Sequence, residues 1–101
     1  MIVYNITTRV HIAIDADWLQ WQREEHIPEI MTTGLFSSYT LLRLLEQDDS
    51  EGYTYATQFR AESAGHYETY VQQHAPLMRK KALEKWGERI ISFRSVLEVI
   101  H

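Results

Sequence analysis

Residues 2–14 alternate between apolar and polar side chains over thirteen positions, which restricts this segment to an extended strand. The apolar positions are Ile2, Tyr4, Ile6, Val10 and Ile12, and the polar positions are Asn5, Thr7, Arg9 and His11. Period-two alternation in β-branched and aromatic residues is typical of a β-strand with one buried face. The other face meets water, a partner or a ligand, so we expect any function to lie there.

A helix should follow, from about Ala16 towards Met31. Asp15 and Asp17 suit its amino end, because a carboxylate accepts from free backbone amides and favours the positive end of the helix dipole. Pro28 lacks an amide hydrogen and crowds the preceding turn, so we expect a kink or break near His26-Ile27.

The remaining sequence predicts two strands, a second helix and a last strand. The strands should cover Leu35–Glu46, Tyr53–Ala61 and Glu88–Ile100, with a polar turn at residues 47–52. Ser63 is a suitable cap for the second helix, which should be divided at Pro76 and finish at Trp86-Gly87.

The predicted order is therefore β-α-β-β-α-β within a single domain covering residues 1–101. Two split β-α-β units with right-handed crossovers give a ferredoxin-like α+β fold, an antiparallel sheet with both helices on one face. The first and third strands should be central, with Arg60 near Val3, Arg94 near Thr7 and Glu98 near the Val3–Asn5 end.

The sheet face away from the helices is predicted to combine polar and apolar residues. By parity we expect Asn5, Thr7, Arg9, Gln58, Arg60, Ser92, Arg94 and Glu98 there, together with Val3, Val96 and, less clearly, Leu42 and Leu44. Such a face is too apolar to be only solvated. By analogy with other domains of this shape, we predict a homodimer that pairs sheet to sheet through this face and closes a dimeric α/β barrel.

The composition of the chain argues against several classes of binding partner. A net charge of −4, with basic residues spread out apart from Arg79-Lys80-Lys81, argues against nucleic acid, and no segment approaches the ~20 apolar residues of a membrane span. The chain has no cysteine, no metal-binding motif and no phosphate loop, so we expect no metal, no cofactor and a cytoplasmic location.

Several short segments resemble a small bacterial family known only as a domain of unknown function. They are Met1–Asn5, His26-Ile27-Pro28-Glu29, Thr33–Phe36, and Phe93-Arg94-Ser95 with Glu98. That family is similar to the dimeric α/β barrel group that includes the antibiotic-biosynthesis monooxygenases. The resemblance covers essentially the whole chain and implies the fold and the dimer. It implies no activity and no catalytic residue.

Three residues are candidates for catalysis: His26, His74 and Asn5. His26 with Glu29 could form a general acid–base pair at the helix kink, or simply cap the end of the helix. Haem-degrading members of the monooxygenase group use an Asn on the first strand and a His on the second helix, which Asn5 and His74 resemble by topology. The tryptophan that accompanies them is missing between Ala61 and Gln73.

Each strand also carries one arginine: Arg9, Arg43, Arg60 and Arg94. Three of them share the open face by parity and could converge on a carboxylate or phosphate, or instead pair with acidic groups across the dimer interface. Our predicted ligand-binding set is Asn5, Thr7, Arg60, Arg94 and Glu98.

The sequence thus predicts an uncharacterised homodimer that binds a small organic molecule between its sheets. One alternative is a cofactor-independent monooxygenase or isomerase acting on a small aromatic substrate. Another is a structural or regulatory dimerisation module.

Overall fold

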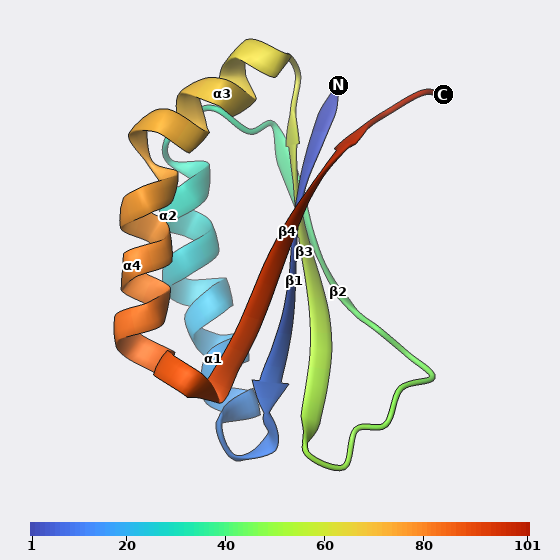
Figure 1. Ribbon diagram of the computed structural model, residues 1–101. Helices are drawn as coiled ribbons and strands as arrows, with labels where there is room; N and C mark the ends of the chain where they lie inside the picture. Colours follow the sequence, from blue (N-terminus) through green and yellow to red (C-terminus); the bar gives the residue numbers. More distant parts are fainter.

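The computed structural model describes residues 1–101. Its strands and helices follow one another in the predicted order, β-α-β-β-α-β. Its elements are β1 (Ile2–His11), α1 (Asp15–Trp21), α2 (Ile27–Met31), β2 (Ser38–Arg43), β3 (Gly52–Ala61), α3 (Ala64–Gln73), α4 (Ala75–Trp86) and β4 (Ile90–Glu98). Short 3₁₀ turns cover Ile12–Ile14 and Gly87–Arg89, and a π-helical turn covers Gln22–His26. Figure 1 shows all helices on one face of the sheet, which confirms the ferredoxin-like α+β prediction.

The four strands are antiparallel and lie in the order β2-β3-β1-β4, so β1 and β3 are central as predicted. Val3 lies opposite Arg60 on β3, and Ile2 lies opposite Glu98 on β4. Arg94 lies opposite Ile6, one residue from the predicted position. The long alternating segment that predicted β1 therefore contributes two of the three strand pairings.

The first helical run is continuous, and Pro28 is accommodated by a π-helical turn rather than by a break. Ile27 donates its amide hydrogen to the carbonyl of Gln22, one residue further back than in an α-helix. Pro28 then occupies the start of α2, where a missing amide hydrogen is tolerated. The sequence predicts a kink or break near His26-Ile27; the run does not break there, and a π-helical turn is what the structure shows.

The second helical run divides at His74, whose backbone leaves the helical region before Pro76 at the start of α4. Ser63 caps α3 as predicted, accepting a 3.1 Å hydrogen bond from the amide of His66. Gly87 ends α4 with φ of +57°, a conformation that side chains other than glycine rarely adopt.

Three strands are shorter than predicted, and the last of them, β4, covers Ile90–Glu98 instead of Glu88–Ile100. β1 ends at His11, because the His11 imidazole accepts a 3.0 Å hydrogen bond from the amide of Ala13 and turns the chain into the α1 layer. β2 begins at Ser38 rather than Leu35, because Phe36 turns into the core before pairing begins.

The helix-facing side of the sheet holds two apolar clusters. One contains Tyr4, Ile27, Ile30, Phe36, Phe59, Ala61, Tyr70, Ala75 and Met78. The other contains Val10, Ile14, Trp18, Trp21, Tyr55 and Trp86. Polar Thr8 and Thr57 on the central strands are buried beside these clusters, so this side of the sheet is not purely apolar.

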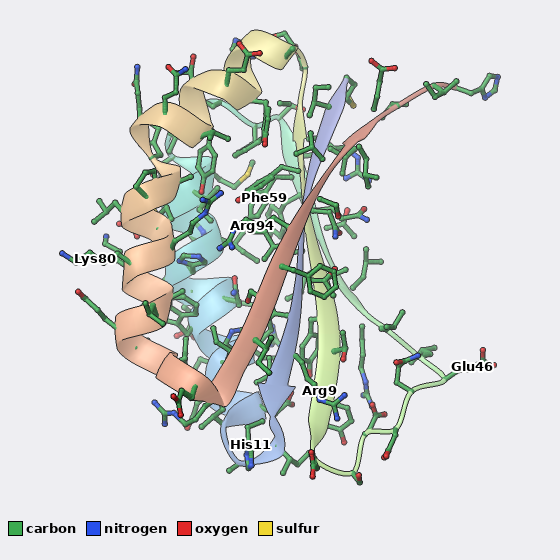
Figure 2. The ribbon with its side chains drawn as sticks, viewed as in Figure 1. Arg9, His11, Glu46, Phe59, Lys80 and Arg94 are labelled. Carbon is green, nitrogen blue, oxygen red and sulfur yellow. The ribbon has the colours of Figure 1, made fainter.

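The predicted faces of β4 are wrong. Arg94 lies opposite Ile6, and directly opposite residues in an antiparallel pair share a face, so Ser92, Arg94, Val96 and Glu98 face the helices. Figure 2 shows Arg94 with Phe59 on the helix side of the sheet and Arg9 on the other side. Both parities of β4 contain apolar residues, which is why its pattern was misleading.

The open face of the sheet is consequently more apolar along β4 than predicted. Ile91 is 68% exposed and Phe93 is 63% exposed, and both lie on this face beside Leu97. Leu42 on β2 also lies there, as predicted. No helix in the structure has both the length and the apolar character needed to cross a membrane.

Candidate functional site

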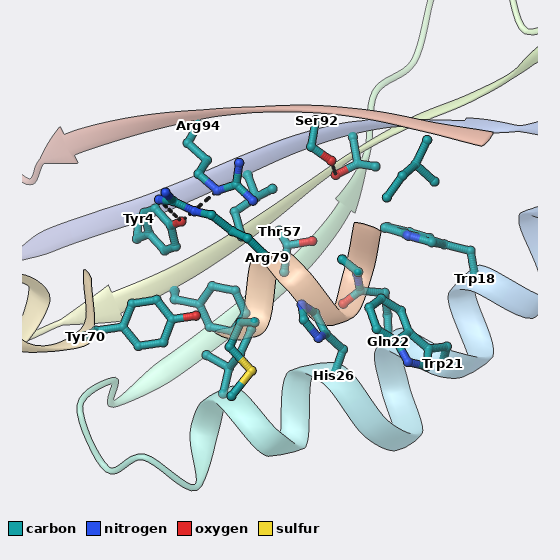
Figure 3. Close-up of a pocket in the computed structure, with 17 residues that line it drawn as sticks. Tyr4, Trp18, Trp21, Gln22, His26, Thr57, Tyr70, Arg79, Ser92 and Arg94 are labelled. Atoms are coloured by element: carbon teal, nitrogen blue, oxygen red, sulfur yellow. Dashed lines mark hydrogen bonds between the residues drawn. The ribbon is translucent and has the colours of Figure 1, made fainter. Parts of the chain in front are cut away.

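A cavity of about 40 Å³ lies between the sheet and the helices, where the two apolar clusters leave space (Figure 3). Trp18 and Trp21 wall one end, and Phe59 and Tyr70 wall the other. A cavity needs roughly 10–15 Å³ to hold one water, so this one accommodates a group of a few heavy atoms.

Two buried polar side chains of the first helical run line this cavity without hydrogen-bond partners. Gln22 is 7% exposed and His26 is 8% exposed, and they lie four residues apart on the inner side of the run. Gln22 Oε1 and His26 Nδ1 have no partner atom. An unpaired buried polar atom costs about 1–3 kcal/mol, so these two lining residues keep hydrogen-bonding capacity that the protein itself leaves unused.

His26 is held in its neutral form. Its ring stacks on Trp21 with centroids 4.3 Å apart and planes 18° apart. Burial lowers the pKa of His26 from 6.5 to about 4, because the charged imidazolium loses its hydration. Glu29 opposes this shift, whereas the charges of Lys81 and Arg94 reinforce it.

Two guanidinium groups converge at the β4 side of the cavity. Arg94 Nε donates to the Tyr4 hydroxyl over 2.9 Å, and Arg79 Nη2 donates to the same oxygen over 3.4 Å. Figure 3 shows both side chains reaching Tyr4 from opposite layers, Arg94 from the sheet and Arg79 from α4. This group of three side chains is the cavity neck.

The neck opens outward into a groove of about 240 Å³ between α4 and β4. Arg79, Ala82, Ile90, Ser92 and Arg94 line both the groove and the inner cavity. On the inner side, Ser92 shares a 2.9 Å hydrogen bond with Thr8. A ligand could therefore pass from solvent between α4 and β4 and meet the two arginines first.

The structure brings only two of the predicted site residues into this cavity, His26 and Arg94. Asn5, Thr7 and Arg60 lie on the open face of the sheet, as predicted, with the Asn5 amide donating to Thr7 Oγ1 over 3.0 Å. Glu98 lies opposite Ile2 near the end of β4, on the helix-facing side, and is exposed. The predicted grouping of all five residues on one face is therefore wrong, because β4 presents its other parity.

The catalytic candidates are likewise separated. Asn5 is on the open face, whereas His74 lies between α3 and α4 and stacks on Tyr70 with centroids 6.0 Å apart. The sheet separates the two, so they do not form one site. His26 lies inside a continuous helical run and does not cap its end, and Glu29 forms an ion pair with Lys81.

The four strand arginines do not converge either. Arg9 donates to the carbonyl of Asp48 over 3.4 Å, and Arg60 donates to Thr40 Oγ1 over 3.0 Å, both on the open face. Arg43 forms an ion pair with Asp49 and covers the ring of Tyr53. Of this set, Arg94 alone reaches the cavity.

Sequence reasoning missed Gln22, Arg79 and Tyr4. A signal existed for Gln22, because Trp18, Gln22, His26 and Ile30 recur every four residues on one helix face, and two polar residues interrupt that buried row. No comparable local pattern marks Arg79, which comes to Tyr4 only through tertiary packing. No group of three or more His, Cys, Asp or Glu side chains is arranged to hold a metal ion.

Residues 1–100 match the family described as domain of unknown function DUF4286, and the chain belongs to this family. The resemblance stated from short segments of the sequence is thereby confirmed. No curated protein matches the chain.

Several solved structures have the same fold, including the following three. The chain is 14% identical to SnoaB, a cofactor-independent oxygenase from Streptomyces nogalater, with a TM-score of 0.63 over 99% of this chain and 94% of that one. A proposed antibiotic biosynthesis monooxygenase from Bacillus cereus is 15% identical, with a TM-score of 0.68 over 99% and 93%. A dimeric ferredoxin-like protein from an uncultured marine organism is 10% identical, with a TM-score of 0.58 over 99% and 96%. At these identities the likeness establishes the fold alone.

Proposed function

We propose that this chain forms a homodimer and that each protomer binds a small organic molecule in the cavity between its helices and its sheet. The observation that carries the proposal is the pair of buried, unpartnered atoms, Gln22 Oε1 and His26 Nδ1, on two residues that line a cavity with aromatic walls. Ligand sites commonly combine apolar walls with a few polar groups that fix orientation.

The sequence predicted a ligand between the two sheets of a dimer. The proposed site lies instead within one protomer, because the polar side of β4 faces the helices. In this proposal the ligand binds on the helix-facing side of the sheet, and the second protomer binds on the open side.

A second copy of this chain is the proposed occupant of the open face. Ile91, Phe93 and Leu97 expose an apolar strip along β4, beside the polar side chains of the central strands. Large exposed apolar patches mark interaction surfaces. The dimeric ferredoxin-like protein among the structural relatives has the same fold, which favours self-association over binding of an unrelated partner.

Native mass spectrometry of the purified protein without added ligand tests both parts of the proposal. We expect a dimer that retains a small molecule. Ala82→Phe should fill the space beside the neck and remove that extra mass. Ala64→Phe makes the same change at an exposed position outside the cavity and should retain it. A monomer would contradict the dimer.

A dimer without extra mass moves the test to a fragment screen by ¹H–¹⁵N NMR. Fragments that bind the cavity should shift the signals of Trp21 and Gln22, and Ala82→Phe should abolish those shifts. A screen in which no fragment shifts these signals would contradict the ligand site.

A proton-transfer enzyme is a second candidate, favoured by the neutral imidazole of His26 inside the cavity. Its unpartnered Nδ1 could accept a proton from a bound enol or phenol, the first step expected of an isomerase or of a cofactor-independent oxygenase, although a pKa of about 4 makes it a weak base for that step. Conversion between the enol and keto forms of phenylpyruvate, followed by ultraviolet absorbance, tests the isomerase. Loss of kcat in His26→Gln with KM unchanged would support it, and equal rates would exclude His26 as the base.

The dimerisation module remains the alternative if no ligand enters the cavity. The cytoplasmic location expected from the sequence stays a prediction.

A further inference from the structure

We propose that the molecule bound in the cavity is a carboxylic acid whose carboxylate lies between the guanidinium groups of Arg79 and Arg94. This inference rests on the proposed function, because it assigns a chemical class to the ligand of the same cavity. It concerns the neck, where the cavity meets the outer groove, rather than the unpartnered atoms that lie deeper.

The two guanidinium groups are brought together from different layers of the fold. Arg94 projects from β4 and Arg79 from α4, and both donate to the hydroxyl oxygen of Tyr4, over 2.9 Å and 3.4 Å. A single neutral oxygen uses one donor atom of each group. Since a guanidinium has five N–H donors, most of the donor capacity at the neck remains free.

No acidic side chain compensates these two positive charges. The three ion pairs of the structure are Arg43–Asp49, Lys80–Glu84 and Lys81–Glu29. The chain has 14 acidic residues and a net charge of −4, so carboxylates are abundant, yet none lies within ion-pair distance of Arg79 or Arg94. Two cations that share one oxygen repel each other, and an anion bound between them would relieve that repulsion.

The shape of the site favours a carboxylate over a phosphate. A guanidinium binds a planar carboxylate through two parallel hydrogen bonds, and a carboxylate can accept from two such groups at once. Phosphate sites commonly add backbone amides from a glycine-rich loop or a helix start. Side chains of strands and mid-helix positions line this neck instead.

The same arrangement gives the ligand an orientation. The carboxylate would remain at the neck, beside Ser92 and the outer groove. The rest of the molecule would extend inward between Trp21 and Tyr70, where a polar atom could pair with Gln22 Oε1 or His26 Nδ1. The inner cavity of about 40 Å³ restricts that inner part to a few heavy atoms.

Binding of matched acids and amides tests the assignment. Acetate and isobutyrate should each bind more tightly than acetamide and isobutyramide by about tenfold or more, since charge-assisted hydrogen bonds are about twice as strong as neutral ones. Isothermal titration calorimetry gives the affinities, and NMR shifts of Trp21 and Gln22 report whether each probe occupies the cavity.

Arg79→Gln and Arg94→Gln should each weaken binding of the acids by about tenfold and leave the amides unchanged. Arg23→Gln is the matched control, because Arg23 is exposed and lies outside the cavity, and it should change neither affinity. Arg94→Lys keeps the charge without the planar fork and should bind acids with intermediate affinity. Thermal melting confirms that each variant is folded before its affinity is compared.

The possible results distinguish failure of the carboxylate assignment from failure of the proposed ligand site. Amides that enter the cavity as tightly as acids would overturn the carboxylate and leave the ligand site intact. Inorganic phosphate that competes more strongly than either acid would also overturn it, in favour of a phosphorylated ligand. If none of the probes, acid or amide, shifts the signals of Trp21 or Gln22, and the fragment screen also fails, the ligand site itself is overturned.

Discussion

Arg94 on edge strand β4 donates from Nε to the hydroxyl of Tyr4 on central strand β1, over 2.9 Å. The Tyr4 ring is buried in the larger apolar cluster, while its hydroxyl reaches the cavity. One contact therefore joins the core to the candidate site. It also fixes which side of β4 faces the helices, and hence which side is free for a partner.

The Tyr4 hydroxyl can be removed without emptying the core. We expect Tyr4→Phe to lower the free energy of unfolding by about 1 kcal/mol, because it removes the oxygen that accepts from two guanidinium groups. The exposure of both arginines limits the loss, since water can replace the missing partner. Urea denaturation measures the change.

Tyr67→Phe is the control, because Tyr67 also packs against the larger cluster and contacts the Tyr4 ring. Its hydroxyl makes no hydrogen bond, so this variant should unfold within about 0.5 kcal/mol of the original protein. An equal loss in both variants would show that the phenol ring environment, and not the hydrogen bonds of Tyr4, determines the effect.

The reversed face of β4 changes which substitution should disrupt the dimer. Phe93→Glu places a charge on the open face, at a position that is 63% exposed in the isolated chain. Burying an unpaired carboxylate costs several kcal/mol, so the dissociation constant of the dimer should rise by about 100-fold or more. Analytical ultracentrifugation over a concentration series measures it.

Val96→Glu is the matched comparison on the same strand. Val96 faces the helix side at the edge of the sheet and is 49% exposed, so a carboxylate there remains solvated. This variant should dimerise normally. Dissociation by Val96→Glu and not by Phe93→Glu would mean that the partner covers the other side of β4.

Most of the fold could be predicted from the sequence because local signals agreed with one another. The alternation in β1, the cap at Ser63, the π-helical turn before Pro28 and the break before Pro76 each depend on neighbouring residues alone. The faces of β4 could not be predicted in the same way. Its two parities are both partly apolar, since one is proposed to meet a partner and the other lines a polar cavity, and period two cannot distinguish those environments.

The candidate site was only partly predictable for a related reason. His26 was identified because a histidine beside Pro28 is conspicuous in the sequence, and Arg94 was identified as one of four strand arginines. Arg79 and Tyr4 are 75 residues apart and meet only when α4 packs on the sheet. Their proximity is a property of the tertiary fold, and no local pattern encodes it.

The buried imidazole of His26 makes the stability of the protein depend on pH. Its pKa is about 4 in the folded chain and 6.5 in the unfolded chain. Between these values the unfolded chain binds a proton that the folded chain does not, so unfolding becomes easier as the pH falls. The contribution of His26 to the free energy of unfolding is therefore fully present above pH 6.5. It decreases as the pH falls towards 4, by about 3 kcal/mol at most.

Urea denaturation of the original protein and of His26→Gln at pH 7.5 and pH 4.5 measures this contribution. The two proteins share every other ionisable group, so the difference between their pH dependences reports mainly on His26. We expect the variant to lose clearly less stability on acidification. Equal losses would mean that His26 is hydrated in the folded chain and titrates normally.

Gly52 at the start of β3 is the position where the fold tolerates no side chain. A Cβ atom there would overlap the Val10 carbonyl oxygen and lie 2.9 Å from its carbonyl carbon. Both atoms belong to the backbone of central strand β1, which cannot move without breaking its pairing with β3. We expect Gly52→Ala to destabilise the protein by about 3 kcal/mol.

Gly65 in α3 offers the opposite environment for the same substitution. A Cβ atom there would approach nothing closer than Ser63 Oγ, at 3.8 Å, and the residue is helical. Alanine restricts the unfolded chain more than glycine does, so Gly65→Ala should stabilise the protein by about 0.5–1 kcal/mol. Thermal and urea denaturation of both variants should therefore give shifts of opposite sign. A Gly52→Ala variant as stable as Gly65→Ala would mean that β1 and β3 are further apart at this end than their register requires.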